Sequence, residues 1–318
     1  MSTKKKLLFT GASGGLAKII ADRMKGDYEI YGIDVRPLRA GNSFPGEFLQ
    51  LDYQHRKVAE LFRTHEFHAM IHLGRLPMEA QYRKFSRFHT NVLGTKNLLE
   101  LCLKHSVLNV IVMSTFHVYG AHQHNHLYIT EDDPLLASHT FPEIADAVEL
   151  DNISVAFSLK HREIRTLILR PVNIIGNRIH NQISKFLRTG ACPVLMGYDP
   201  MQQFIHESDM AEAVVDALNG DQAGIYNIAG EGVIPFSKAV ELAGSKSIPV
   251  PEFLKSPGIH LMKWIGFDFP NHLIEYFKYP VILSDRAFRR DFAYQPKVTT
   301  KDALESLITG IPGSAIEQ

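Results

Sequence analysis

A glycine-rich turn carries the most informative chemistry in this sequence. The apolar run Lys6–Thr10 leads into Gly11-Ala12-Ser13-Gly14-Gly15-Leu16, after which Ile19, Ile20 and Met24 recur at helical spacing. Glycines allow a tight turn and let the backbone approach a pyrophosphate, which the unpaired N–H groups at the start of the helix would bind. We therefore expect a phosphate-bearing ligand to contact Gly11, Ser13, Gly14, Gly15 and Leu16.

An acidic residue ends the next apolar run, Tyr28–Ile33. Asp34 lies 23 residues after Gly11, and a carboxylate at that place accepts both hydroxyls of an adenosine ribose and repels a 2′-phosphate. Arg36 has the opposite effect on cofactor choice, because a basic side chain there tolerates the 2′-phosphate of NADP. We expect the cofactor to be NAD, with NADP disfavoured.

The elements that must position these residues alternate between strands and helices. Further strands are predicted at His68–Leu73, Val110–Met113 and Thr166–Leu169, and helices at Asn91–Leu103 and along a face formed by Ile144, Val148, Val155 and Leu159. This alternation predicts an α/β fold, a doubly wound parallel sheet of the Rossmann type with a smaller C-terminal α/β region. The NAD-binding domain would take mainly residues 1–173 and 203–229, and the substrate or lid region mainly 174–202 and 230–318.

Composition excludes several classes of protein. The 318 residues are 45% hydrophobic, and 34 basic side chains balance 34 acidic ones. Such a chain is neither disordered nor suited to electrostatic binding of nucleic acid. We expect no membrane span, because no apolar run is long enough. The two cysteines, Cys102 and Cys192, form no disulfide framework, which favours a cytoplasmic location.

Further motifs follow in order along the chain. They are His72-Leu73-Gly74-Arg75, Asn91-Val92-Leu93-Gly94-Thr95, Ser114-Thr115-Phe116-His117-Val118-Tyr119-Gly120, Leu169-Arg170-Pro171-Val172-Asn173 and Phe204-Ile205-His206-Glu207-Ser208-Asp209. With the glycine turn, they resemble the extended short-chain dehydrogenase/reductases, the group of NAD-dependent nucleotide-sugar epimerases and dehydratases. The resemblance implies a small-molecule substrate, a nucleotide sugar in this group, and a homodimer. It adds these residues to the cofactor site: Asp52, Tyr53, Leu73, Gly74, Arg75, Asn91 and Pro171.

The chain departs from this family at the catalytic residues. The family uses a Ser or Thr, which Thr115 matches, together with a Tyr and a Lys spaced YxxxK on the following helix. When the helix Glu of the family is aligned with Glu149, Phe141 and Ala145 occupy the Tyr and Lys positions. No Tyr or Lys occurs between Glu131 and Ser158. Tyr53 and Lys57 have the YxxxK spacing, but they follow the third predicted strand and would lie on a different helix from the family's catalytic pair. The substitute acid would be His139, with Tyr128 and His117 as alternatives.

The substrate side departs as well. Asn173 matches the family residue that contacts a substrate diphosphate, but Gln202 stands where an Arg is expected, so Arg286, Arg289 or Arg290 would have to supply the charge. We expect no metal at His117, His122, His124 and His126, whose spacing fits no standard site.

Three functional hypotheses stay open. The first is an enzyme that uses a substitute acid. The second is a non-catalytic NAD-binding sensor, assembly factor or structural protein. The third is a lipid-surface partner, which the aromatic stretch 253–277 suggests.

Overall fold

A parallel sheet forms the centre of the computed structural model, which describes residues 4–39, 41, 43–77, 84–251 and 273–309. The sheet has 7 strands in the order β11-β6-β5-β4-β1-β2-β3. Their bounds are β1 Lys5–Thr10, β2 Tyr28–Asp34, β3 Glu47–Gln50, β4 Phe67–His72, β5 Asn109–Met113, β6 Arg165–Pro171 and β11 Gly224–Ile228. The predicted doubly wound sheet is confirmed, and the strand order reverses between β1 and β4.

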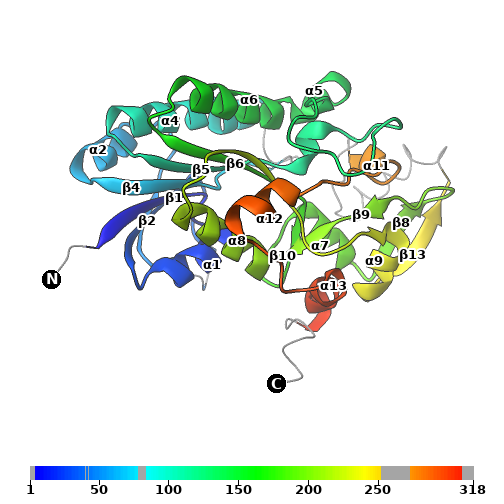
Figure 1. Cartoon of the computed structure of the whole chain (residues 1–318). Helices are drawn as coiled ribbons and strands as arrows, with labels where there is room; N and C mark the ends of the chain where they lie inside the picture. The colour runs from blue at the N-terminus through cyan, green and yellow to red at the C-terminus, as the bar shows by residue number, and fades with distance from the viewer. Residues whose placement is uncertain (1–3, 40, 42, 78–83, 252–272, 310–318) are drawn as a thin grey trace.

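Helices cover both faces of the sheet (Figure 1). One face packs against α1 (Gly15–Met24) and α8 (Glu207–Asn219), and the other against α2 (Arg56–Thr64), α4 (Thr95–Lys104) and α6 (Ala145–Lys160). The strands are apolar on both sides because both faces are covered, and Leu7, Leu8 and Phe9 of β1 are fully buried. Continuous apolar runs of this kind are typical of parallel sheets.

Two predicted helices differ in detail from the structure. The helix expected at Asn91–Leu103 is divided: α3 (Lys84–Phe88) runs into a π-helical turn, η1 (His89–Gly94), and α4 begins only at Thr95. Along α6 the predicted apolar face is confirmed at Ile144 and Val148, which are buried, but is wrong at Leu159, which is exposed, whereas the polar residues Asp151 and Ser154 are fully buried. Asp151 turns inward because it binds the buried Arg170.

The remaining elements lie mainly at one end of the sheet, toward the right of Figure 1. Three two-stranded sheets pair β7 with β10, β9 with β12 and β8 with β13. Their bounds are β7 Asn173–Ile175, β8 Ala191–Leu195, β9 Met201–Gln202, β10 Phe204–His206, β12 Ile234–Pro235 and β13 Lys246–Val250. The helices and turns not yet named are η2 Phe116–Tyr119, α5 Ala137–Thr140, η3 Pro142–Ile144, α7 Gln182–Leu187, α9 Phe236–Leu242, α11 Leu273–Tyr276, α12 Arg286–Phe292 and α13 Thr300–Thr309.

Two expectations about the chain stay predictions. Strand β11 joins the large sheet and β10 pairs with β7 outside it, and the assignment of residues 203–229 to an NAD-binding domain remains a prediction. Most of the aromatic stretch 253–277, including Trp264, lies outside the described residues. Within the part of the chain that the structure describes, no helix is both long and apolar enough to cross a membrane.

Candidate functional site

A cavity of about 1050 Å³ opens at the carboxyl ends of β1 and β4, where the strand order reverses. Ligands of open α/β sheets bind at this point. Among the described residues that line it, the basic side chains are Lys18, Arg36, Arg39, Arg75, Arg178 and Lys185, whereas Asp146 is the one acid. Such a wall favours an anionic ligand, and the volume is at the upper end of small-molecule sites.

The glycine turn forms one wall of this cavity, and its glycines have different roles. Gly11 has a φ of +68°, and a Cβ there would lie 2.6 Å from Gly74 Cα. A Cβ on Gly15 would lie 2.1 Å from the carbonyl oxygen of Arg178. Gly14 is less constrained, since its Cβ would meet only the Gly11 oxygen, at 3.1 Å. Gly11 and Gly15 therefore serve close packing, and Gly14 leaves room on the cavity side.

The backbone donors of the turn are used unequally. The N–H of Gly11 donates to Tyr53 Oη at 3.1 Å, that of Ser13 to Asp34 Oδ2 at 3.1 Å, and that of Gly14 to Gly11 O at 2.9 Å. Gly15 and Leu16 open helix α1, where N–H groups have no intrahelical acceptor. Of the five residues predicted to contact a phosphate, Gly15 and Leu16 are therefore the ones whose N–H groups remain available. Both lie at the positive end of the helix dipole.

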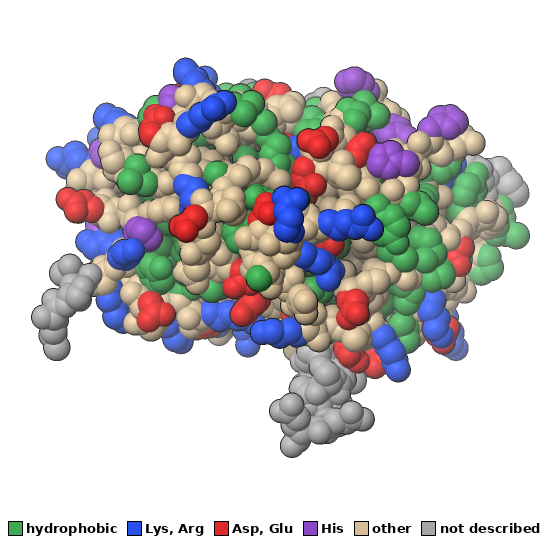
Figure 2. All heavy atoms as spheres, in the orientation of Figure 1, with side chains coloured by type: hydrophobic (Ala, Val, Ile, Leu, Met, Phe, Trp, Pro, Cys, Tyr) green, Lys and Arg blue, Asp and Glu red, His purple; other side chains and the backbone are tan. Residues whose placement is uncertain are grey.

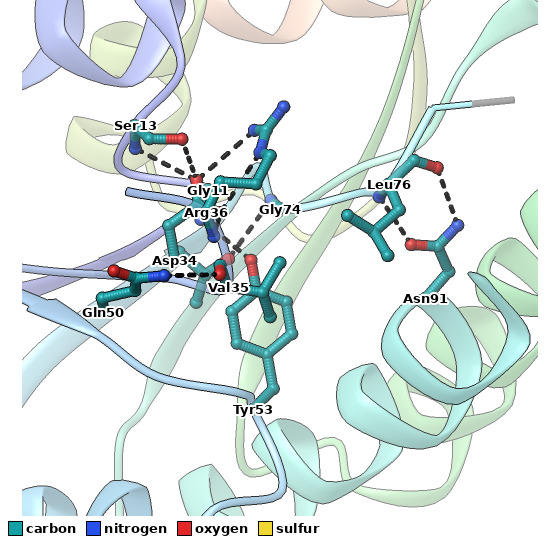
Figure 3. A network of polar contacts seen from close by, with 11 residues as sticks. Gly11, Ser13, Asp34, Val35, Arg36, Gln50, Tyr53, Gly74, Leu76 and Asn91 are labelled. Atoms are coloured by element: carbon teal, nitrogen blue, oxygen red, sulfur yellow. Dashed lines mark hydrogen bonds and ion pairs between the residues drawn. The ribbon is translucent and has the colours of Figure 1, made fainter. Parts of the chain in front are cut away.

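Asp34 lies at the end of β2 with its carboxylate already engaged (Figure 3). Oδ2 accepts from Ser13 Oγ at 2.6 Å, and Oδ1 accepts from Arg36 N at 2.9 Å and Arg36 Nε at 3.3 Å. Asp34 is buried, whereas Arg36 lines the cavity. Asp34 and Arg36, which the sequence analysis treated as opposing influences on cofactor choice, therefore form one ion pair.

Three predicted cofactor contacts lie outside the cavity lining. Tyr53 is 1% exposed and supports the turn through its contact with Gly11, and burial raises the pKa of its phenol. Asn91 is fully buried and holds the backbone of Leu76: its Oδ1 accepts from Leu76 N at 2.7 Å (Figure 3). Asp52 is exposed and accepts from Gln54 N. Tyr53 and Asn91 thus support the wall from beneath, whereas Asp52 lies outside the lining on the surface.

The remaining cofactor predictions fall at the cavity. Leu73, Arg75 and Pro171 line it. Gly74 packs directly against Gly11, so that no side chain could be accommodated between the two loops. The Gly74 N–H donates to Thr10 Oγ1 at 3.2 Å, which fixes the loop after β4 to the end of β1.

The end of the cavity near β5 holds Thr115, as predicted, and a histidine beside it. Thr115 Oγ1 lies 2.8 Å from His117 Nδ1, and both residues line the cavity. Tyr276 packs on His117, with ring centroids 4.8 Å apart, and its Oη donates to His117 O at 2.6 Å. The preferred substitute acid, His139, is exposed and outside the lining, as is Tyr128. Of the three residues that the sequence offered, the structure brings only His117 to Thr115.

The end of η3 and the first turn of α6 form another part of the cavity wall. The residues that line the cavity here are Ile144, Asp146 and Ala147. Phe141 is buried against Tyr276, with ring centroids 6.1 Å apart, and Glu149, the residue used for the alignment, is exposed. The assignment of Phe141 and Ala145 to the catalytic positions stays a prediction. The wall itself contains no phenol and no ammonium from this helix.

Asn173 and Gln202 also line the cavity, together with a basic segment that the sequence did not single out. Arg178, His180 and Lys185 belong to the lining. The Gln202 side chain donates to Tyr276 O at 3.0 Å. The arginines expected to replace the missing charge lie elsewhere: Arg289 pairs with Asp285 and Arg290 with Asp291, and with Arg286 they are absent from the described lining.

Several histidine side chains gather on one part of the surface, at the upper right of Figure 2. His126 Nε2 lies 2.8 Å from Asp133 Oδ1, and this hydrogen bond raises the pKa of His126. In the described ranges of the chain, no three His, Cys, Asp or Glu side chains are grouped so that they could hold a metal ion.

Comparison with known proteins agrees with the fold and the motifs. The model of the NAD dependent epimerase/dehydratase family matches residues 7–229, so the chain belongs to that family. The predicted resemblance is thereby confirmed.

The relatives include proteins of known and unknown activity. An uncharacterized protein of Mycobacterium tuberculosis is 28% identical over 275 residues, which cover 83% of this chain and 71% of that protein. UDP-glucose 4-epimerase of Bacillus subtilis is 25% identical over 295 residues, 79% of this chain and 86% of the enzyme.

Solved structures share the whole fold at low sequence identity. UDP-glucose 4-epimerase of Thermotoga maritima with UDP-glucose has a TM-score of 0.75 at 16% identity, over 96% of this chain and 98% of that one. The dTDP-glucose 4,6-dehydratase of Bacillus anthracis in complex with NAD has a TM-score of 0.74 at 17% identity, over 96% of each chain.

Proposed function

We propose that this protein binds NAD across the reversal of its sheet and a second, phosphorylated ligand of the nucleotide-sugar class beside it. The observation that carries the proposal is the continuity of one cavity from the glycine turn to Thr115 and to the cationic segment of Arg178 and Lys185. The residues fit a dinucleotide: Gly15 and Leu16 offer N–H groups to the pyrophosphate, and Asp34 with Arg36 marks the adenosine end. Bound NAD would supply a hydride acceptor or donor.

We propose a preference for NAD over NADP. The Asp34 carboxylate supports it, because a 2′-phosphate would be repelled there. The ion pair with Arg36 opposes part of this repulsion, with Arg36 Nε 3.3 Å from Asp34 Oδ1. We expect Asp34→Ala to weaken NAD binding and to narrow the gap between the two cofactors. Arg36→Gln should widen the gap, since the remaining carboxylate is unpaired.

The second ligand is proposed to be anionic. Asn173 offers a neutral polar contact, and Arg178 and Lys185 offer charge-assisted bonds to a diphosphate, in place of the Arg that Gln202 replaces. The relatives named as UDP-glucose 4-epimerases support a nucleotide sugar as the substrate class. A cytoplasmic location is also proposed, and the two buried, unpaired cysteines support it. The homodimer stays a proposal.

The chemistry divides into two candidates. In the first, the protein binds NAD without turnover. This candidate is supported by the absence of Tyr and Lys between Glu131 and Ser158, the segment to which the family resemblance assigns the pair. In the second, the Thr115 hydroxyl accepts the proton of a substrate hydroxyl and passes its own proton to His117 Nδ1. The separation of 2.8 Å between Thr115 Oγ1 and His117 Nδ1 favours this second candidate over one that uses His139.

Calorimetric titration with NAD, NADP and UDP-glucose tests the binding proposal. We expect NAD to bind more tightly than NADP, and absence of NAD binding would overturn the proposal. Oxidation or epimerisation of UDP-glucose or related nucleotide sugars is then followed in wild type, His117→Gln and His139→Gln. Turnover that His117→Gln abolishes and His139→Gln preserves identifies the histidine mechanism. No turnover, together with NAD binding, identifies the binding protein.

A further inference from the structure

Asp146 is a fixed carboxylate on the cavity wall that the proposed function does not use. Asp146 Oδ2 accepts from Asn91 Nδ2 at 2.6 Å, and its side chain is 11% exposed. Asn91 is itself held at both ends of its amide, because Oδ1 accepts from Leu76 N at 2.7 Å and Nδ2 donates to Leu76 O at 3.1 Å. The backbone after β4 therefore sets the position of the Asp146 carboxylate.

The other oxygen of Asp146 has a weaker attachment. Arg87 Nη2 lies 3.8 Å from Oδ1, beyond hydrogen-bond distance, and instead donates to the carbonyl of Glu143 at 2.9 Å. Among the described residues, none donates a hydrogen bond to Oδ1. Asn91 thus holds Oδ2 of Asp146 in place, and Oδ1 can still accept a hydrogen bond from a ligand.

Arg75 completes this part of the wall. Its half-buried side chain lines the cavity, and no hydrogen bond joins its guanidinium to another residue of the described ranges. Burial lowers the pKa of Arg75, the Asp146 charge opposes that shift, and the Arg87 charge adds to it. The cavity wall therefore carries a carboxylate and a guanidinium of opposite charge, both with capacity for a ligand.

The strand order decides which half of a dinucleotide meets these side chains. Asp34 and Arg36 follow β2, on one side of the reversal between β1 and β4. Arg75 follows β4, and Asp146 is joined through Asn91 to Leu76 of the same loop, on the other side. A dinucleotide that lies across the reversal, with its adenosine at Asp34, places its second ribose on the side of Arg75 and Asp146.

We infer that Asp146 and Arg75 bind the ribose that carries the nicotinamide, with Asp146 accepting a hydrogen bond from a ribose hydroxyl and Arg75 donating to the same sugar. This inference rests on the proposed function. It gives the first turn of α6 a binding role in a chain that lacks a Tyr and a Lys there. Asp146 and Arg75 would orient the sugar without transferring a proton.

Three ligands that differ by one group test the inference by calorimetry. ADP lacks the second ribose, ADP-ribose has it without the nicotinamide, and NAD has both. We expect Asp146→Asn to weaken NAD and ADP-ribose by about 10- to 100-fold, the usual effect of losing a charge-assisted hydrogen bond. ADP should bind within about twofold of wild type. Arg75→Gln should show the same pattern.

Glu149→Gln is the matched control, because it removes the same charge from an exposed position of the same helix. It should leave the affinities for all three ligands unchanged. Thermal unfolding of each variant checks that it is folded, and Arg75→Gln provides an independent test should Asp146→Asn fail to fold. Unchanged NAD affinity in Asp146→Asn and Arg75→Gln overturns the inference and leaves the proposed function intact. Equal weakening of ADP, ADP-ribose and NAD also overturns it, since that pattern indicates a structural role. Absence of both NAD and ADP binding in wild type overturns the proposed function itself.

Discussion

Replacing Gly14 by valine separates phosphate binding from folding. Gly14 precedes α1 with φ −78° and ψ 148°, a conformation that valine adopts readily. A Cβ there meets only the Gly11 carbonyl, at 3.1 Å. The added isopropyl group would therefore occupy cavity space in front of the turn and would hold a pyrophosphate away from the N–H groups of Gly15 and Leu16.

The expected magnitudes differ for binding and for stability. Loss of two charge-assisted hydrogen bonds costs about 3–6 kcal/mol, which weakens NAD by about 10²- to 10⁴-fold. The free energy of unfolding should fall by about 1 kcal/mol, because valine is a poorer N-cap than glycine. That change lowers the Tm by about 2–4 °C.

Calorimetry gives the affinity, and thermal unfolding without ligand gives the stability. Gly14→Ala is the graded variant, with a smaller loss of affinity. NAD affinity within about threefold of wild type in Gly14→Val would refute the reasoning, because the glycine would then serve only the turn. A fall in Tm of more than 10 °C would also contradict it, since the new Cβ meets one atom, the Gly11 oxygen at 3.1 Å, which a small shift relieves.

Three further predictions concern stability. Gly15→Ala should destabilise the fold by about 1–3 kcal/mol, because the new Cβ would lie 2.1 Å from Arg178 O. Urea unfolding measures this change, and stability equal to that of Gly14→Ala would contradict the packing role of Gly15. Asp151→Asn should cost about 3–5 kcal/mol by the same assay, since the Arg170 guanidinium, 2.7 Å away, would be left buried beside a neutral group, and a loss below 1 kcal/mol would argue against it. Burial lowers the pKa of His72 to about 4, so its neutral form is favoured in the fold: stability should be full above the unfolded pKa of about 6.5 and should fall as the pH drops from there toward 4, by up to about 3 kcal/mol. Urea unfolding across that range should show this slope in wild type and a shallower one in His72→Gln, and equal slopes would exclude His72 as its source.

The features that the sequence predicted correctly are local ones. The glycine turn, the strand ends at Thr10 and Asp34, and the parallel sheet are encoded in short runs of apolar residues and in the conformational freedom of glycine. Thr115 could be placed for the same reason, because its motif is continuous. The lack of Tyr and Lys between Glu131 and Ser158 is a fact of composition that no fold can change.

Contacts between residues that are far apart in the chain could not be predicted from local sequence patterns. The helical period assigned the stripe through Val148, Val155 and Leu159 to the core, but within this stripe Leu159 is exposed and the polar residue Asp151 is buried against Arg170. The choice of His139 over His117 followed sequence proximity to Phe141, and exposure decided against it. Polar contacts override apolar periodicity in such cases, because a buried charge must be paired.

The sequence by itself determined the class of fold, the glycine turn and the absence of Tyr and Lys between Glu131 and Ser158, because each depends on neighbouring residues. Only the tertiary structure decided which N–H groups of the turn remain available, that Asp34 is paired with Arg36, and that Asp146 is held through Asn91 by Leu76. Asp146 and Asn91 are 55 residues apart in the chain, and no local pattern records that the sheet brings them within hydrogen-bond distance.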